Sequence, residues 1–367
     1  MEAKRDDAGE RAQGELVSRS LVADASDIAR LRDCFARNSE RQRSQAHFEW
    51  LYLRNPSRQM FVDVATTADG RVVAVYASLP SWVRAGEQRS LVLQSLDTLT
   101  DREYRGRGLF VSLARSLYRR AQAAGCALIY GFPNGNSAHG FFAKLDWSRL
   151  DPVPFLVRPL RLRYGASKLE ALRRFERWLP DVPLVAPWAP TPPGSRLVTL
   201  ARFDERVTAL WTSFRAGRIQ LAVERDAAYF DWRIADKPDE TYRTLALERK
   251  DGTLDALCTF TVKDKHGGRI GYVMELLYRP GATLSGVALL ARAVRDMARE
   301  GADALLAWCL PQSPNIAGYH LNGFVPLPTR LRDIELHFGA HAFQPAFTSQ
   351  VAARAAWYVS YLDSDTV

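Results

Sequence analysis

The spacing of hydrophobic positions changes most clearly between residues 96 and 125. Leucine and threonine dominate the run from Leu96 to Thr100, which is typical of a short β-strand. After a polar stretch, apolar residues recur every three or four positions from Leu109 to Ala124, and Gly125 interrupts the pattern. The pattern predicts a strand, a turn, and a helix that ends at the glycine.

Several segments of the chain resemble later ones in the same order. The segment "FEWLYLRNP" from Phe48 is echoed by "FDWRIADKP" from Phe230, an offset of 182 residues. The turn dipeptides at residues 69–70 and 251–252, both Asp-Gly, keep this offset. The segment "AAGCALIYGFPNGNSAHGFFAKLDW" resembles "REGADALLAWCLPQSPNIAGYHLNGFV" at an offset of 176 to 177. Three matches in order predict a duplicated unit.

Each unit is expected to contain helices, two strands around the Asp-Gly turn, a central strand, a helix, another strand and a last helix. The predicted fold class is α/β (α+β), with two units that each form a mixed, mostly antiparallel sheet flanked by helices. The expected domains are residues 1–155, a Pro- and Arg-rich linker over 156–195, and residues 196–367.

The expected linker contains a basic amphipathic helix between Arg161 and Leu179. Its apolar stripe comprises Leu169, Leu172, Phe175 and Leu179. Such a helix either lies on an anionic membrane or packs its stripe on its own domain. Both alternatives are open from the sequence.

Charge and composition limit the classes of ligand and location. The chain has 367 residues, a net charge of +9 and a pI near 9.5, which favour anionic ligands such as nucleic acid, a membrane surface or a phosphorylated cofactor. The four cysteines form no CxxC pair, so neither a metal site nor a disulfide framework is expected. The amino-terminal segment lacks a signal-type apolar core, and no apolar run approaches the roughly 18 residues of a membrane span, so a cytoplasmic location is expected.

Two glycines stand in the predicted turn between the strand and the helix. The segment "DREYRGRGLF" places Gly106 and Gly108 beside Arg105 and Arg107. A helix amino terminus offers unpaired amides and a positive dipole end, and glycine lets a phosphate approach the backbone closely. The nucleotide-triphosphate loop and the dinucleotide fingerprint are both excluded, because their remaining residues are missing.

This segment resembles the GNAT superfamily of acyl-CoA N-acyltransferases, whose signature is [QR]-x-x-G-x-[GA]. Here it reads "EYRGRG", with Glu103 in the first position. The following "GCALIYGFPNGNSAHGFFAKLDW" is similar to the fifth strand and fourth helix of the superfamily, with Asp146 and Trp147 in place of its Gly-Phe.

The resemblance implies a binding site for acetyl-CoA as co-substrate. The backbone near the end of the fourth strand would pair with the pantetheine arm, and the amides of the turn would hold the pyrophosphate. Asn134 or Asn136 would contact the pantetheine or the substrate, although both are also good turn formers. The implied cofactor-binding residues are Thr98, Leu99, Thr100, Arg105, Gly106, Arg107, Gly108, Leu109, Phe110, Asn134 and Asn136.

The same resemblance suggests candidates for catalysis. Asp97 is the first candidate for the general base, and His139 is the second. Many relatives use a tyrosine of the fourth helix as the acid, but the corresponding residue here is Phe142, while the second unit has Tyr319. The second unit lacks the glycine pair, so one acyl-CoA site is expected, in the first unit.

The expected activity is transfer of acetyl from acetyl-CoA to an amine. Tandem proteins of this type occur with bacterial surface-polysaccharide genes, which suggests an amino sugar as acceptor. The alternatives are a tRNA-dependent aminoacyl transferase and a CoA-binding protein without catalysis. The expected partner is a small-molecule or glycan-precursor amine, with a peripheral membrane contact and no nucleic acid.

Overall fold

A computed structural model describes residues 16–38, 42–86, 88–169, 172–185, 190–332 and 336–364. The chain divides into two compact units. The first comprises the described residues up to Pro80 together with Gln94–Gly125, and the second comprises Ser81–Leu93 together with the described residues from Cys126 onward. Two long strands therefore run from one unit into the other.

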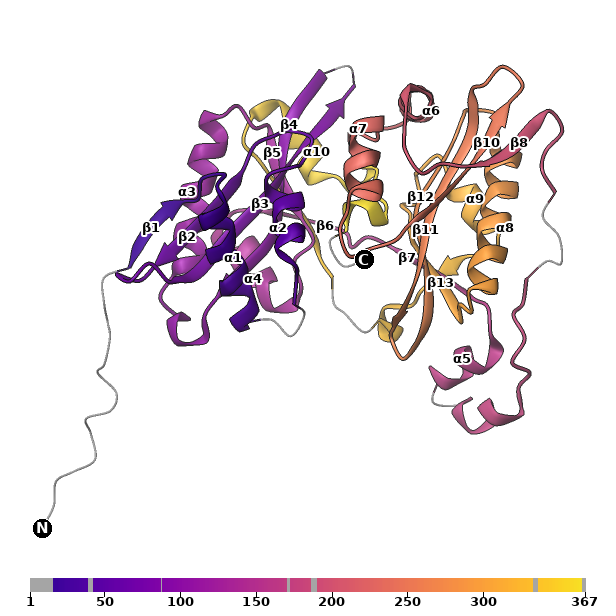
Figure 1. The fold of residues 1–367 in the computed structure, drawn as a ribbon, viewed down its shortest axis with the longest axis horizontal. Coiled ribbons are helices and arrows are strands. Elements are labelled where there is room, and N and C mark those ends of the chain that lie inside the picture. Colours follow the sequence, from indigo (N-terminus) through magenta and orange to yellow (C-terminus); the bar gives the residue numbers. More distant parts are fainter. Residues whose placement is uncertain are drawn as a thin grey trace, which may run out of the picture. The chain divides into compact units, whose positions relative to one another are not determined.

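The first unit contains the strand–turn–helix that the hydrophobic pattern predicts. Its strands are ordered β1-β2-β3-β4, with β1 and β3 both antiparallel to β2, while α1 packs on α2 and α3 packs on β2 (Figure 1). The elements are β1 (Val17–Ser20), α1 (Ala25–Asn38), α2 (Gln45–Tyr52), β2 (Phe61–Thr66), β3 (Val72–Ala85), β4 (Gln88–Thr100), a 3-10 turn at Arg102–Tyr104, and α3 (Leu109–Ala123).

The second unit contains the remaining helices and strands. They are β5 (Leu128–Gly131), α4 (Gly135–Lys144), β6 (Ser148–Leu150), β7 (Phe155–Pro159), α5 (Leu162–Ser167), β8 (Ser195–Thr199), α6 (Glu205–Arg215), β9 (Leu221–Val223), α7 (Ala227–Phe230), β10 (Arg243–Arg249), β11 (Leu254–Lys265), β12 (Gly268–Tyr278), α8 (Thr283–Arg299), β13 (Ala304–Trp308), α9 (Ile316–Leu321), β14 (Val325–Pro326), β15 (Phe338–Ala342) and α10 (Thr348–Ala352). Short 3-10 and π-helical turns lie at Arg173–Trp178, Asp231–Ala235, Thr329–Leu331, Pro345–Phe347, Arg354–Ala356 and Tyr361–Asp363.

A seven-stranded sheet forms the core of the second unit. Its order is β14-β7-β13-β12-β11-β10-β8, and β12 and β13 are its one parallel pair among the described strands. Helix α8 covers one face of β10, β11 and β12, as Figure 1 shows. Apolar side chains of α8 such as Leu290 and Met297 are fully buried there. The expected class, mixed sheets flanked by helices, is confirmed.

Two strands are exchanged between the regions that the sequence repeat defines. Strand β7 follows the first copy of the repeat but pairs antiparallel with β13 of the second copy. Strand β15 follows the second copy but lies between β5 and β6 of the first. The compact units change over at residues 80–81, 93–94 and 125–126. The start of the expected linker, Phe155–Pro159, is strand β7 of the seven-stranded sheet.

The order of elements repeats along the chain. The series β2, β3, β4, α3, β5, α4 is matched by β10, β11, β12, α8, β13, α9. The Asp-Gly turns also match in conformation, since Gly70 and Gly252 have φ of +83° and +82°. Near the end of each copy, Asp146 and Gly323 both adopt positive φ, so Asp146 has the left-handed conformation that a glycine adopts more readily.

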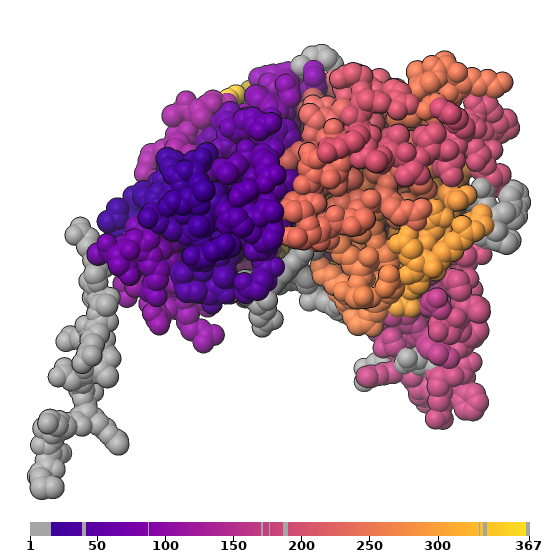
Figure 2. All heavy atoms as spheres, in the orientation of Figure 1, coloured from indigo at the N-terminus to yellow at the C-terminus, as the bar shows by residue number. Residues whose placement is uncertain are grey.

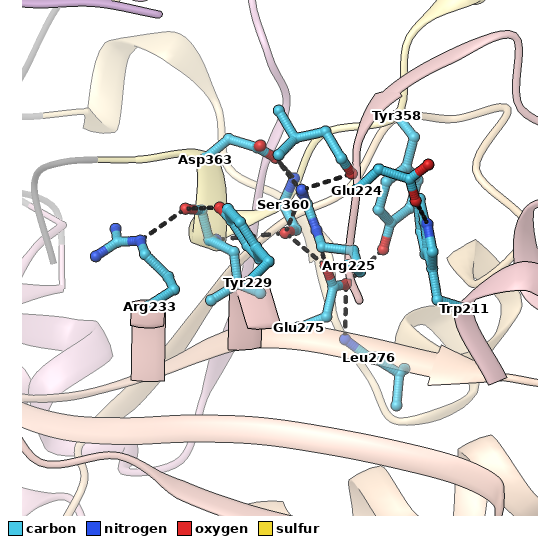
Figure 3. Close-up of polar contacts among 12 residues, drawn as sticks. Trp211, Glu224, Arg225, Tyr229, Arg233, Glu275, Leu276, Tyr358, Ser360 and Asp363 are labelled. Carbon is cyan, nitrogen blue, oxygen red and sulfur yellow. Dashed lines mark hydrogen bonds and ion pairs between the residues drawn. The ribbon is translucent and has the colours of Figure 1, made fainter. Parts of the chain in front are cut away.

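The second unit contains a fully buried arginine between two carboxylates (Figure 3). Arg225 donates from Nε to Glu275 at 3.0 Å and from Nη2 to Asp363 at 2.6 Å. Glu275 also accepts hydrogen bonds from the hydroxyls of Ser360, at 2.9 Å, and Tyr358. Burial alone would lower the pKa of Arg225, but the neighbouring negative charges, Asp363 first, hold that pKa well above its ordinary value. The cluster ties the carboxyl-terminal segment to β12.

The four cysteines are free and buried. Burial raises the pKa of the Cys34 thiol to about 12 and raises the pKa of Cys258 and Cys309 further. Within the described ranges, no group of three or more His, Cys, Asp or Glu side chains is placed to hold a metal ion. Among the described helices, none combines the length and apolar character that crossing a bilayer requires.

Candidate functional site

The turn between β4 and α3 has the features expected of an anion site. Gly106 and Gly108 have φ of +79° and +73°, a region that residues with a Cβ seldom adopt. A Cβ at either position would meet no protein atom within 4 Å, so the backbone faces open space. Gly108 directly precedes α3, and no side chain caps the helix. The first turn of α3 therefore directs its positive dipole end toward the space beside the glycines.

Two exposed arginines flank these glycines. Arg105 donates from Nε to the carbonyl oxygen of Thr100 at 3.3 Å, which holds its side chain near the end of β4. The guanidinium of Arg107 lies over the ring of Tyr104, 4.9 Å from its centroid. Leu109 follows within the first turn of α3. The turn thus combines backbone amides with two positive charges, a combination suited to a phosphate group.

Asp97 interrupts the strand that leads into this turn. It lies within β4 with φ of +48°, a conformation that bends a strand and re-aims its side chains. Residues 98–100, which follow it, are half-buried. These residues form the part of the candidate site that the backbone of β4 supplies.

The carboxylate of Asp97 is engaged by two side chains that the sequence analysis missed. Arg43 donates from Nη1 to both carboxylate oxygens at 2.7 Å, and the hydroxyl of Tyr52 donates to Oδ2 at 2.7 Å. The Asp97 side chain is only 4% exposed. These contacts occupy three of the roughly four acceptor positions of the carboxylate, so Oδ1 keeps one lone pair for a proton. One sequence signal was available, because Tyr52 stands where the second copy has Ile234.

A chain of hydroxyl groups lies beside the first turn of α3. Ser95 donates to the hydroxyl of Tyr76 at 3.1 Å, which in turn lies 2.9 Å from the hydroxyl of Tyr118. The ring of Phe110 packs against Tyr76, with centroids 5.6 Å apart. Burial raises the pKa of Tyr76, although the bonds from its two neighbours oppose this. Tyr76 therefore remains a protonated hydrogen-bonding group.

The other predicted polar residues lie on α4, in the second unit. Asn134 is the N-cap of α4, and its Oδ1 accepts hydrogen bonds from the amides of Asn136 and Ser137, both at 3.1 Å. Asn136 and His139 are exposed. The capping role gives Asn134 a structural function, and a ligand contact from any of these three residues stays a prediction.

Phe142 and Tyr319 occupy different surroundings in the second unit. Phe142 packs against β15, where a Cβ at Gly339 would come within 2.7 Å of its ring. Tyr319 is fully buried in the core beneath α8, and burial holds its pKa well above the ordinary value. The described residues provide no hydrogen-bond partner for the Tyr319 hydroxyl. Tyr319 is therefore part of the apolar core in this conformation.

Tyr319→Phe is expected to leave turnover unchanged. A phenol buried in the core is poorly placed to protonate a leaving group, and its removal eliminates an unsatisfied hydroxyl. Such removal is close to neutral or stabilises a fold by about 1 kcal/mol. Steady-state kinetics and denaturant unfolding measure the two effects. A large fall in turnover with unchanged stability would instead show that the second copy supplies the acid.

The equivalent turn of the second copy lacks the pair of glycines. Gly281 keeps a left-handed φ of +79°, but the residue before α8 is Ala282 rather than glycine. Further along α8, a Cβ at Gly286 would lie 2.2 Å from the ring of Tyr278. That glycine therefore allows close helix–strand packing, and the second copy has no counterpart of the paired glycines.

The first part of the chain matches a known protein-family model. Residues 23–150 match the model of the acetyltransferase (GNAT) domain. This range includes Asp97, the glycine turn and α4. No curated protein matches the sequence.

Solved structures resemble the chain over most of its length. A Saccharomyces cerevisiae N-myristoyltransferase with bound myristoyl-CoA has a TM-score of 0.60 and 13% identity, covering 91% of this chain and 84% of that one. A conserved Enterococcus faecalis V583 protein of unknown function, described as a probable N-acyltransferase, has a TM-score of 0.59 and 12% identity, covering 90% and 73%. Residues 23–150 therefore match a GNAT acetyltransferase domain model, and the chain as a whole has a fold similar to that of solved N-acyltransferases.

Proposed function

We propose that the protein is an N-acyltransferase that moves an acyl group from acyl-CoA to an amine. The observation that carries this proposal is the open glycine turn at the uncapped amino end of α3, inside the part of the chain that matches the GNAT model. The turn offers the backbone amides and positive charge that a pyrophosphate requires. The corresponding turn of the second copy lacks the paired glycines, because Ala282 precedes α8, and this favours one acyl-CoA site per chain.

The residues of this turn have distinct roles in the proposed site. The amides from Arg105 to Phe110 hold the pyrophosphate, and the two arginines add charge. The half-buried backbone of Thr98, Leu99 and Thr100 pairs with the pantetheine arm. The conformation of β4 and α3 and the family resemblance of the motif support these assignments.

The proposed reaction forms one C–N bond and breaks one C–S bond. The amine nitrogen attacks the thioester carbonyl, the amine proton passes to a base, and the CoA thiolate departs and takes up a proton. Asp97 is the proposed base, with Arg43 and Tyr52 orienting its carboxylate. Solvent is the proposed proton source for the thiolate, since Phe142 has no acidic proton and Tyr319 is buried.

Acetyl is the proposed acyl group, and an amino sugar is the proposed acceptor. The acetyltransferase description of the matching family model supports acetyl, whereas a similar fold binds myristoyl-CoA. The acceptor rests on the sequence resemblance alone. Calorimetry with acetyl-, octanoyl- and myristoyl-CoA tests the donor, and release of free CoA thiol over a panel of amines, amino sugars included, tests the acceptor.

The same experiments separate the alternative functions. Tight binding of acyl-CoA without thiol release for any amine would favour a non-catalytic CoA-binding protein. Binding of tRNA with a steep salt dependence, in the absence of acyl-CoA binding, would favour aminoacyl transfer from tRNA. Absence of binding to every acyl-CoA would contradict the proposed function.

Gly108→Val is expected to weaken acetyl-CoA binding at least tenfold, about 1.4 kcal/mol. The added side chain occupies the open space at the amino end of α3, where the pyrophosphate is proposed to bind. The left-handed φ of Gly108 adds backbone strain, because valine avoids this conformation. Calorimetry measures the affinity, and a melting curve verifies folding.

Gly281→Val is the matched control for this variant. Gly281 has a φ of +79°, and a Cβ at this position would meet no protein atom within 4 Å. Valine at residue 281 therefore causes backbone strain similar to that in Gly108→Val, but in the turn of the second copy. Its acetyl-CoA affinity should equal that of the parent. Unchanged affinity in folded Gly108→Val, or an equal loss in both variants, would contradict the assignment of the site.

A further inference from the structure

Exposed apolar side chains are concentrated between β7 and β8. This stretch, residues 161–185 without the undescribed 170–171, is here called the projecting segment, and Figures 1 and 2 show it as a magenta lobe extending from the second unit. Seven of the twelve large hydrophobic side chains exposed on the described part of the chain lie in it. They are Leu162, Leu169, Leu172, Phe175, Trp178, Val182 and Leu184.

The projecting segment does not form the single amphipathic helix expected from its sequence. Helix α5 ends at Ser167, and a separate 3-10 turn spans Arg173–Trp178. Leu169, Leu172 and Phe175 of the expected stripe are exposed rather than packed on the domain. Trp178 is 74% exposed. These three side chains of the stripe therefore do not pack on their own domain.

Positive charge is interleaved with these apolar groups. The cationic residues are Arg161, Arg163, Lys168, Arg173, Arg174 and Arg177. The acidic residues in the same stretch of sequence are Glu170, Glu176 and Asp181, so six positive charges face three negative ones. Asp181 pairs with Arg161 at 3.1 Å and with Arg163 at 4.0 Å.

Two arginines of the 3-10 turn stack on the exposed aromatic rings. The guanidinium of Arg174 lies 4.7 Å from the centroid of Phe175, and that of Arg177 lies 5.2 Å from the centroid of Trp178. Each pair presents an apolar ring and a cation at the same place on the surface. Such pairs are favoured at the boundary between lipid headgroups and acyl chains, because the apolar ring can contact the acyl chains while the cation contacts the charged headgroups.

We propose that the projecting segment docks the protein on the surface of an anionic lipid bilayer. The exposed leucines and aromatic rings enter the headgroup boundary, and the arginines pair with lipid phosphates. A second copy of the chain is a poorer occupant, because it would bring two positively charged segments together. Charge complementarity therefore favours an anionic partner, and the apolar groups favour one with a hydrocarbon interior. This inference does not depend on the proposed acyl transfer.

Vesicle co-sedimentation of the full chain tests this proposal. Vesicles of phosphatidylcholine alone are compared with vesicles that also contain about 30% phosphatidylglycerol, which gives their surface a negative potential. The protein should sediment with the anionic vesicles and remain largely in solution with the neutral ones. Raising the salt concentration from about 0.1 M to 0.5 M should weaken the binding, since salt screens exposed charges.

Variants distinguish docking by this segment from general attraction of a basic protein. Arg174→Gln/Arg177→Gln should lower the affinity for anionic vesicles at least about tenfold, because each arginine near an anionic membrane surface adds to the binding free energy. Arg119→Gln/Arg218→Gln removes the same charge from exposed positions elsewhere and should retain binding. Phe175→Asp/Trp178→Asp should abolish binding, whereas Trp178→Phe should preserve most of it.

Four outcomes would overturn the proposal. The first is that the parent protein does not bind the anionic vesicles, and the second is that both arginine double variants lose vesicle binding equally. The third is that Phe175→Asp/Trp178→Asp still binds the vesicles. The fourth is that the parent forms a concentration-dependent dimer but does not bind vesicles, and that Phe175→Asp/Trp178→Asp is monomeric. Light scattering measures the dimer. Circular dichroism verifies folding, which is expected because every substituted side chain is exposed.

Discussion

Asp97→Asn is expected to lower turnover by about 10²- to 10⁴-fold, the range that a general base contributes. Asparagine keeps the size of the side chain and can still accept from Tyr52, but it lacks a basic carboxylate. Acyl-CoA affinity should remain near that of the parent, because the carboxylate acts on the amine and not on the pyrophosphate. Thiol-release kinetics with the acceptor identified by the amine screen, together with calorimetry, measure the two quantities.

Tyr52→Phe is the control that separates a base from a structural tie. This variant removes one hydrogen bond to the same carboxylate and leaves Arg43 paired with it at 2.7 Å. If Asp97 is the base, turnover in Tyr52→Phe should fall far less than in Asp97→Asn. If Asp97 only joins β4 to α2, both variants should lose thermal stability while turnover persists. Parental activity of Asp97→Asn over the whole pH range would leave His139 as the next candidate.

Arg225→Leu is expected to lower the free energy of unfolding by about 3–5 kcal/mol, the usual effect of removing one member of a buried ion pair. The substitution leaves Glu275 and Asp363 buried near each other without a cation. Both carboxylates come from elements that pack together only in the folded unit, so the repulsion acts on the folded state. Denaturant unfolding followed by tryptophan fluorescence measures the change.

Two further variants test the cause of this loss. Arg202→Leu breaks an exposed ion pair with Asp236, 2.6 Å long, and should have little effect because solvent screens such pairs. Adding Glu275→Gln and Asp363→Asn to Arg225→Leu should recover part of the stability, since no buried charge then lacks a partner. Failure of this triple variant to recover would mean that the packing of the arginine, rather than its charge, supports the unit.

The parts of the fold set by short-range chemistry were predictable from the sequence. The turn before α3 needs glycine because its backbone is left-handed, and Gly125 ends the helical pattern for the same reason, with φ of +77°. The Asp-Gly turns and the repeated order of elements follow from equally local signals. The sequence pattern therefore predicted the glycine turn and the start of α3 within a few residues.

Contacts across long stretches of chain were not predictable. Asp97 meets Arg43 and Tyr52 across separations of 54 and 45 residues, and no local pattern specifies which arginine will reach a carboxylate. The pairing of β7 with β13, and of β15 with β5 and β6, joins strands that are far apart in the sequence, and no local pattern specifies these partners. The projecting segment has helical periodicity, but no surface covers its apolar stripe, and it forms the short helix α5 and a separate 3-10 turn instead of one long helix.

The position of β15 affects how the protein is synthesised. Leu128 of β5 pairs with Ala342, so roughly 10 to 40 s separate the emergence of the two strands at 5–20 residues per second. Throughout that interval the nascent chain presents the edge of β5 without its final neighbour. An unpaired strand edge can pair with another chain. We therefore expect the first copy of the repeat to be most prone to aggregation while the ribosome is still translating the second copy.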